Sequence, residues 1–109
     1  MARAPSHVPG RESRGAAALG ALEAEVLNEK VESLGRAGRK AQDALAKLAA
    51  FAGAPDSEAY QALLAAAVDA VWAYSVQSEL CGLPGAARIM RDLAVPPAVT
   101  ARLGIATPR

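Results

Sequence analysis

A heptad pattern of apolar and small residues is the feature that most constrains this chain. The pattern consists of Leu27, Val31, Leu34, Gly38, Ala41, Leu45, Leu48 and Ala52, with alternating steps of four and three. This spacing places the residues on one side of a helix, and it is typical of helices that pack with nearly parallel or antiparallel axes. The sequence therefore predicts a long first helix, beginning at about Gly15, that packs against another helix.

A second helix is predicted after a turn at residues 53–55. The proline at the end of that segment restrains the residue before it, and the glycine at its start suits a left-handed helix cap. Asp56 or Ser57 then caps a helix that continues to Leu80. The second half of this helix, AVWAYSVQSELC, is apolar on more than one face, which predicts a central position. Gly82 suits its C-terminal cap.

Two shorter helices are predicted at residues 85–94 and 97–103, and the sequence carries no strand signal. The predicted fold class is all-α, a long antiparallel helical hairpin with one or two short C-terminal helices packed on it. Residues 15–104 are expected to form a single helical domain. A disordered N-terminal tail at 1–14 and a flexible C-terminus at 105–109 are expected on either side.

The two main helices are predicted to differ in length, at roughly 37 and roughly 25 residues, or about 55 Å and about 37 Å at the helical rise. Residues 15–27 therefore have no partner in the second helix. An apolar stripe at Leu19, Leu22 and Val26 lies in this unmatched part. Either residues 84–103 or a second subunit would cover it.

Composition and charge exclude several classes of function. Among 109 residues, 28 are alanine, which favours tightly packed helices because alanine buries little area and needs close backbone approach. The net charge of +1 disfavours nucleic acid as a partner, since binding to the phosphate backbone usually requires a strong basic excess. The only cysteine, Cys81, and the only histidine, His7, form no metal-ligand pattern and no internal disulfide, so we expect no metal.

Targeting and membrane segments are not expected. The first fifteen residues, MARAPSHVPGRESRG, lack the continuous apolar stretch of a signal peptide, and no window approaches the ~20 apolar residues of a spanning helix. These features predict a cytoplasmic protein that does not enter a membrane.

The heptapeptide LGRAGRK, residues 34–40, has two interpretations. In the first, Gly38 thins the first helix opposite Val71 and Trp72, so that large and small side chains interdigitate. The predicted helix contact then comprises Leu34, Gly38, Ala41, Leu45, Val71 and Trp72. In the second, the G-x-x-G pattern and the cations Arg36, Arg39 and Lys40 hold an anion. We favour packing, because an anion clamp needs free backbone N–H groups and the helical repeat is unbroken here.

Glu79 and Cys81 are candidates for chemically active residues. Glu79 follows Trp72 by seven residues, and burial there would require a cation such as Arg88 or Arg91, which predicts a structural ion pair. Cys81 falls at a helix C-terminus, where the helix dipole opposes a thiolate, so we expect a small buried hydrophobe. A small-ligand pocket between Trp72, Glu79, Cys81 and the C-terminal helices is a weaker hypothesis.

Three segments resemble a family of short bacterial proteins of unknown function. They are LGRAGRKAQDAL, AVWAYSVQSELCGL and IMRDLAVPPAVTARLG, and the resemblance covers about two-thirds of the chain, without the N-terminal tail. The resemblance implies a helical fold and a bacterial cytoplasm. It implies no activity, and it assigns no functional residues.

The sequence predicts a protein-interaction or self-associating structural module, with a protein partner or a homodimer. No catalytic triad, phosphate-binding loop or dinucleotide-binding fingerprint is present, so we expect neither an enzyme nor a cofactor. The alternative function is nucleic-acid or phosphate-ligand binding through Arg36, Arg39 and Lys40, with help from the arginines at positions 3, 11 and 14.

Overall fold

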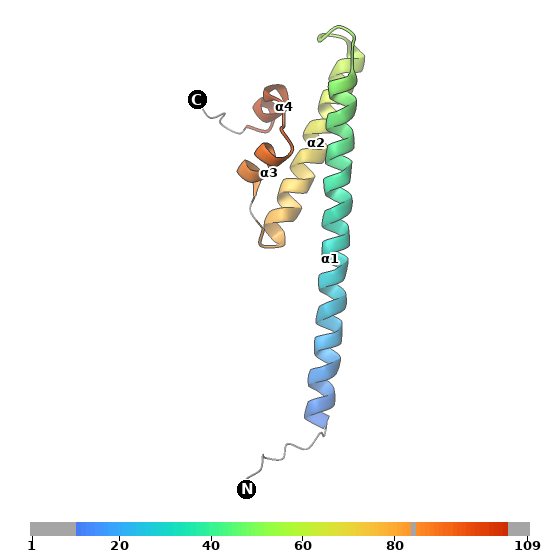
Figure 1. Cartoon of the computed structure of the whole chain (residues 1–109), viewed down its shortest axis with the longest axis vertical. Helices are drawn as coiled ribbons and strands as arrows, with labels where there is room; N and C mark the ends of the chain where they lie inside the picture. The colour runs from blue at the N-terminus through green and yellow to red at the C-terminus, as the bar shows by residue number, and fades with distance from the viewer. Residues whose placement is uncertain (1–10, 84, 105–109) are drawn as a thin grey trace. The chain divides into compact units, whose positions relative to one another are not determined.

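The chain is all-α throughout the described residues. The computed structural model describes residues 11–83 and 85–104, and the side chains of all of these except 11–13. Within them lie four helices and no strand: α1 (Arg11–Ala50), α2 (Glu58–Leu80), α3 (Ala86–Asp92) and α4 (Pro97–Arg102) (Figure 1). The predicted long hairpin followed by short C-terminal helices is confirmed.

Two compact units make up the chain, Met1–Glu32 and Ser33–Arg109. In the first unit the described residues are the N-terminal turns of α1, which begins at Arg11 rather than near Gly15. The second unit contains the C-terminal turns of α1 together with α2, α3 and α4. The predicted termini at 1–14 and 105–109 lie largely outside the described residues.

In the second unit α1 and α2 pack antiparallel. Near the start of this unit, the Gln77 side-chain amide donates a hydrogen bond to Ser33 Oγ over 2.5 Å. Further along α1, Gly38 lies against Tyr74, and at the end of the helix Leu48 shares a cluster with Leu64. As the residue numbers along α1 rise, the residue numbers of the contact partners in α2 therefore fall, as an antiparallel hairpin requires.

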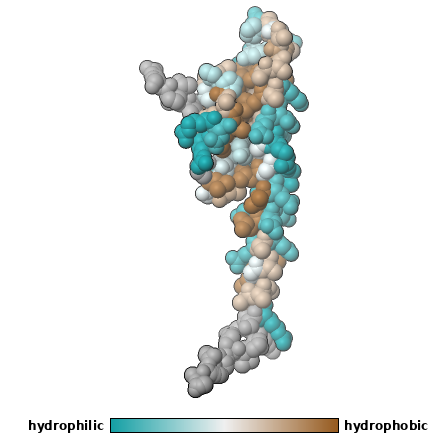
Figure 2. Space-filling model, viewed as in Figure 1, coloured by the Kyte–Doolittle hydropathy of each residue, from teal (hydrophilic) through white to brown (hydrophobic). Residues whose placement is uncertain are grey.

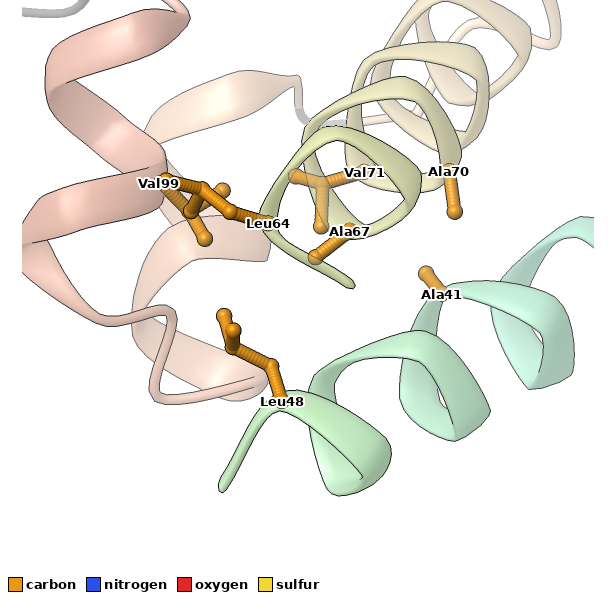
Figure 3. Packing of buried hydrophobic residues seen from close by; sticks show 7 residues of the cluster. All are labelled: Ala41, Leu48, Leu64, Ala67, Ala70, Val71 and Val99. Atoms are coloured by element: carbon orange, nitrogen blue, oxygen red, sulfur yellow. The ribbon is translucent and has the colours of Figure 1, made fainter. Parts of the chain in front are cut away.

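The core of this unit is built from small side chains. The cluster of buried residues comprises Ala41, Leu48, Leu64, Ala67, Ala70, Val71 and Val99, contributed by α1, α2 and α4 (Figure 3). The largest side chains that are wholly buried are two valines, Val71 and Val99. Because each side chain removes little area from water, the helices gain stability by approaching closely, as the alanine content predicts.

Both ends of α2 follow their sequence signals, whereas α1 ends at Ala50 and Gly53 lacks the left-handed φ predicted for it. Ser57 is the N-cap of α2, and its hydroxyl accepts a hydrogen bond from the Tyr60 amide over 3.1 Å. At the other end, Gly82 has φ of 77°, and the amides of Gly82 and Leu83 donate to the Glu79 and Ser78 carbonyls. This paired pattern is a Schellman motif, and its glycine occupies the left-handed position as predicted.

The short helices pack on α2 (Figure 1). Ile89 and Val99 are the buried residues through which α3 and α4 contribute to the interior, while Met90, Leu93 and Leu103 are partly buried against the core. Pro97 begins α4, where a missing N–H costs nothing. A hydrogen bond of 2.7 Å from the Arg102 guanidinium to Gln61 Oε1 also joins α4 to α2.

Candidate interaction surface

The described part of the first unit carries an exposed apolar row. Every residue from Arg14 to Glu32 is exposed. The apolar row consists of Leu19, Leu22, Val26, Leu27 and Val31, whose exposed fractions lie between 51% and 61%. Brown, apolar surface is visible along this part of α1 (Figure 2). Exposed aliphatic side chains on successive helical turns mark a surface suited to contact with another chain.

Residues 34–40 form uninterrupted helix, and Gly38 serves helix packing. A Cβ atom added at Gly38 would lie 3.2 Å from both Cε1 and Cζ of Tyr74. Of the two predicted partners of this glycine, Val71 and Trp72, the second was wrong, because Tyr74 lies over the glycine and Trp72 is 57% exposed. Among the other predicted packing residues, Ala41 and Val71 are wholly buried, Leu45 packs against the core and Leu34 is half-buried.

The three cations of this segment face solvent. Arg36, Arg39 and Lys40 are exposed, and none of them forms an ion pair within the part of the chain that the structure describes. The Arg39 guanidinium folds back toward Gly35, 3.4 Å from where a Cβ would stand. Because the backbone amides here are engaged in the helix, the segment offers no amide cradle, and an anion would meet side chains alone.

The predicted buried ion pair does not form. Glu79 and Arg91 are exposed, and Arg88 pairs instead with Asp92, one turn along α3, at 3.4 Å. The Glu79 carboxylate approaches Gly85 at the start of α3, where an added Cβ would lie 2.6 Å from Oε1. Glu79 therefore remains in water and needs no cation. Cys81, expected to be buried, is half-buried as the C-cap of α2.

A groove of about 600 Å³ lies where the C-terminal end of α1 meets α2 and the segment joining α3 to α4. Its polar side chains are Gln42, Tyr60 and Asp92, and the remaining lining is mainly alanine, leucine and proline. Asp92 is already paired with Arg88. Trp72, Glu79 and Cys81, the residues predicted to line a ligand pocket, are not among the lining residues of this groove.

A second groove, of about 550 Å³, follows the seam between α1 and α2. This seam groove is lined by Ala37, Lys40, Ala66, Asp69, Ala70 and Ala73. Four alanines leave the groove wide, and one cation and one carboxylate give it charges of both signs. Sequence periodicity could place these alanines near the contact, but it could not show that they leave space unfilled.

An exposed apolar patch on the C-terminal half of α2 was not predicted. It consists of Trp72, Val76, Leu80 and Leu83, with exposed fractions of 57%, 37%, 79% and 49%. The first three residues lie four apart, so they follow one side of the helix. The available signal was that this half of α2 is apolar on more than one face, so that not every face could be buried.

No helix of the described residues is long and apolar enough to cross a membrane. Within the same residues, no three His, Cys, Asp or Glu side chains gather as a metal site would require. His7 lies outside them.

Fold and surface together define a small all-α protein that presents apolar rows and charged helix faces. The chain belongs to a family of unknown function, DUF6665, whose family model matches residues 10–109. The match extends beyond the two-thirds of the chain covered by the sequence resemblance. No curated protein and no solved structure matches the chain.

Proposed function

We propose that this protein is a protein-interaction module without catalytic activity, and that it binds another chain through the apolar row of α1. The observation that carries the proposal is the exposure of five large aliphatic side chains between Leu19 and Val31. When another surface covers aliphatic side chains on successive turns of a water-exposed helix, apolar area is removed from water, which is favourable. The C-terminal helices α3 and α4 already use their apolar side chains on α2.

The absence of catalytic activity is part of this proposal. It is supported by the lack of catalytic motifs in the sequence and by the interactions of the polar residues that line the groove of about 600 Å³. There Asp92 forms an exposed ion pair with Arg88, and the Tyr60 ring lies tilted against Phe51, with 5.8 Å between ring centroids. The residues that line this groove include no serine, cysteine, histidine or lysine that could act beside them as a nucleophile or base.

Binding through the row is tested with Leu22→Gln/Val26→Gln, which makes its centre polar while retaining good helix formers. The control is Ala17→Gln/Ala21→Gln, at exposed positions on the opposite side of the helix. Sedimentation would measure self-association, and affinity capture from the native host would measure binding to other proteins. We expect Leu22→Gln/Val26→Gln to lose the self-association or the partner binding that the wild type and the control show. Equal behaviour of all three proteins would refute the proposal.

The alternative function is binding of nucleic acid or phosphate ligands through Arg36, Arg39 and Lys40. The observation favouring it is that these cations are exposed and without ion pairs within the described residues. Such binding would weaken steeply with salt, because it releases counterions, and Arg36→Ala/Arg39→Ala/Lys40→Ala would abolish it. Absence of binding to DNA or RNA at low salt would exclude this function.

A further inference from the structure

We propose that the apolar row of one copy docks into the seam groove of a second copy, so that two copies associate with their α1 helices antiparallel. This inference rests on the proposed function, because it names the partner of the same row. It commits to a second copy of this chain as the occupant of the groove, and it is argued from the shape of the groove and from the distribution of charge along α1.

The row and the groove differ in size in a complementary way. The row carries only leucine and valine side chains, each more than half exposed. The seam groove offers about 550 Å³, and four of its six lining residues are alanine. Large side chains entering a surface of small ones reproduce the interdigitation by which helices pack within proteins.

Charge along α1 is divided between its halves. Residues 15–32 carry four glutamates and one lysine, a net charge of −3. Residues 33–50 carry four cations and one aspartate, a net charge of +3. Antiparallel pairing sets each acidic half against the basic half of the other copy, whereas parallel pairing in register sets like against like. Charges at an interface select orientation and partner in this way.

The groove carries the same complementarity locally. Lys40 and Asp69 line it from α1 and α2, and the row is interleaved with Glu23, Glu29 and Lys30. The row and the seam groove therefore each carry a cation and a carboxylate, and each of these charges has a group of opposite charge on the other surface. Because both copies present the same row and the same groove, the contact can be made twice about a two-fold axis, which doubles the apolar surface removed from water.

Charge reversal tests this contact in the full-length protein. Glu25→Lys/Glu29→Lys makes residues 15–32 positive, so each copy presents two basic halves. Arg36→Glu/Lys40→Glu makes residues 33–50 negative, so each copy presents two acidic halves. We expect each variant alone to dimerise roughly tenfold or more weakly than the wild type, and an equimolar mixture of the two to recover the dimer. Arg91→Glu, at an exposed position on α3, is the control and should dimerise normally.

Cross-linking tests where the row docks. In a Cys81→Ser background, Val26→Cys marks the row and Ala73→Cys marks the groove wall. A short bismaleimide should join the two variants when they are mixed, and should join Val26→Cys copies to each other far less. Efficient cross-linking of Val26→Cys with itself would instead mean that two rows meet, and it would overturn the inference.

The outcomes separate the inference from the proposed function. A dimer that charge reversal leaves unchanged, or a mixture that fails to recover it, would overturn docking in the groove while self-association through the row survives. A wild type that sediments as a monomer would overturn the inference outright, and the row variant would still decide whether another protein binds there.

Discussion

Gly38 permits the close contact between α1 and the Tyr74 ring. Since a Cβ at this position would already lie 3.2 Å from two ring atoms, a branched side chain fits only if the Tyr74 ring shifts or the helices separate. We expect Gly38→Leu to lower the free energy of unfolding by about 1–3 kcal/mol, the usual cost of overfilling a packed contact. Gly20→Leu is the matched control, because nothing lies within 4 Å of that glycine. Urea denaturation of both variants would measure the difference, and equal stability would contradict the assignment.

Ala94 holds an unusual backbone conformation for a residue with a side chain. It has φ of 50°, and its amide and that of Val95 donate to the Arg91 and Met90 carbonyls at the end of α3. This is the same motif that Gly82 closes in α2, but here a Cβ atom opposes the left-handed geometry.

Replacing Ala94 with glycine should therefore stabilise the protein. We expect Ala94→Gly to raise the free energy of unfolding by about 0.5–1 kcal/mol, with relief of strain exceeding the entropy that glycine adds to the unfolded chain. Thermal unfolding followed by circular dichroism would measure this change. Ala87→Gly, within α3 and exposed, should instead destabilise. A loss of stability in Ala94→Gly would show that the φ of Ala94 carries no strain.

At the residue scale, the sequence predicted what Gly38 does but not which side chain covers it. The repeat fixes the side of α1 that meets α2, so a glycine on that side indicates close approach. Choosing between Trp72 and Tyr74 requires the rotation of α2, and its second half is apolar on more than one face. The buried ion pair at Glu79 failed for the same reason, because it assumed that the side of α2 bearing Trp72 faces inward.

The elements themselves were predictable, because local signals determine where they end. The cap at Ser57 and the glycine at position 82 act within a few residues of the chain, and each operates as the sequence predicts. Proline at the start of α4 is another such signal. The exception is the end of α1, which lies at Ala50, and Gly53 does not adopt the left-handed conformation predicted for it. The grooves were not predictable, because a groove depends on space left between side chains from separate helices.

Substitution of Ser57 tests how much one N-cap stabilises α2. Its hydroxyl accepts from the Tyr60 amide at 3.1 Å and donates to the Ala54 carbonyl at 2.8 Å, so it joins α2 to the preceding turn. We expect Ser57→Ala to cost about 1 kcal/mol of unfolding free energy, because the amide loses its partner. Ser57→Asp, which retains an acceptor, should cost much less when both are measured by denaturant unfolding. An alanine variant as stable as the aspartate variant would mean that the cap contributes nothing.

Across the whole molecule, side-chain burial is uneven along α1. Within the second unit Ala41 and Leu48 are buried in the core cluster, so their helical turns open only when that cluster is disrupted. In the first unit, the side chains from Arg14 to Glu32 are all exposed, so these turns gain no stability from buried side chains. In proteins, most helical stability comes from the tertiary packing of one face of the helix. The proposed contact with a second copy would supply the missing tertiary packing.

Hydrogen exchange would measure this difference directly. In dilute solution we expect the amides of residues 15–32 to exchange orders of magnitude faster than those of residues 41–48, because they open without disturbing the core. Raising the protein concentration should slow exchange selectively in residues 15–32 as the row becomes covered. The Leu22→Gln/Val26→Gln variant should exchange rapidly there at every concentration. Uniform protection along α1 in dilute wild-type protein would mean that the first unit has a source of stability other than association.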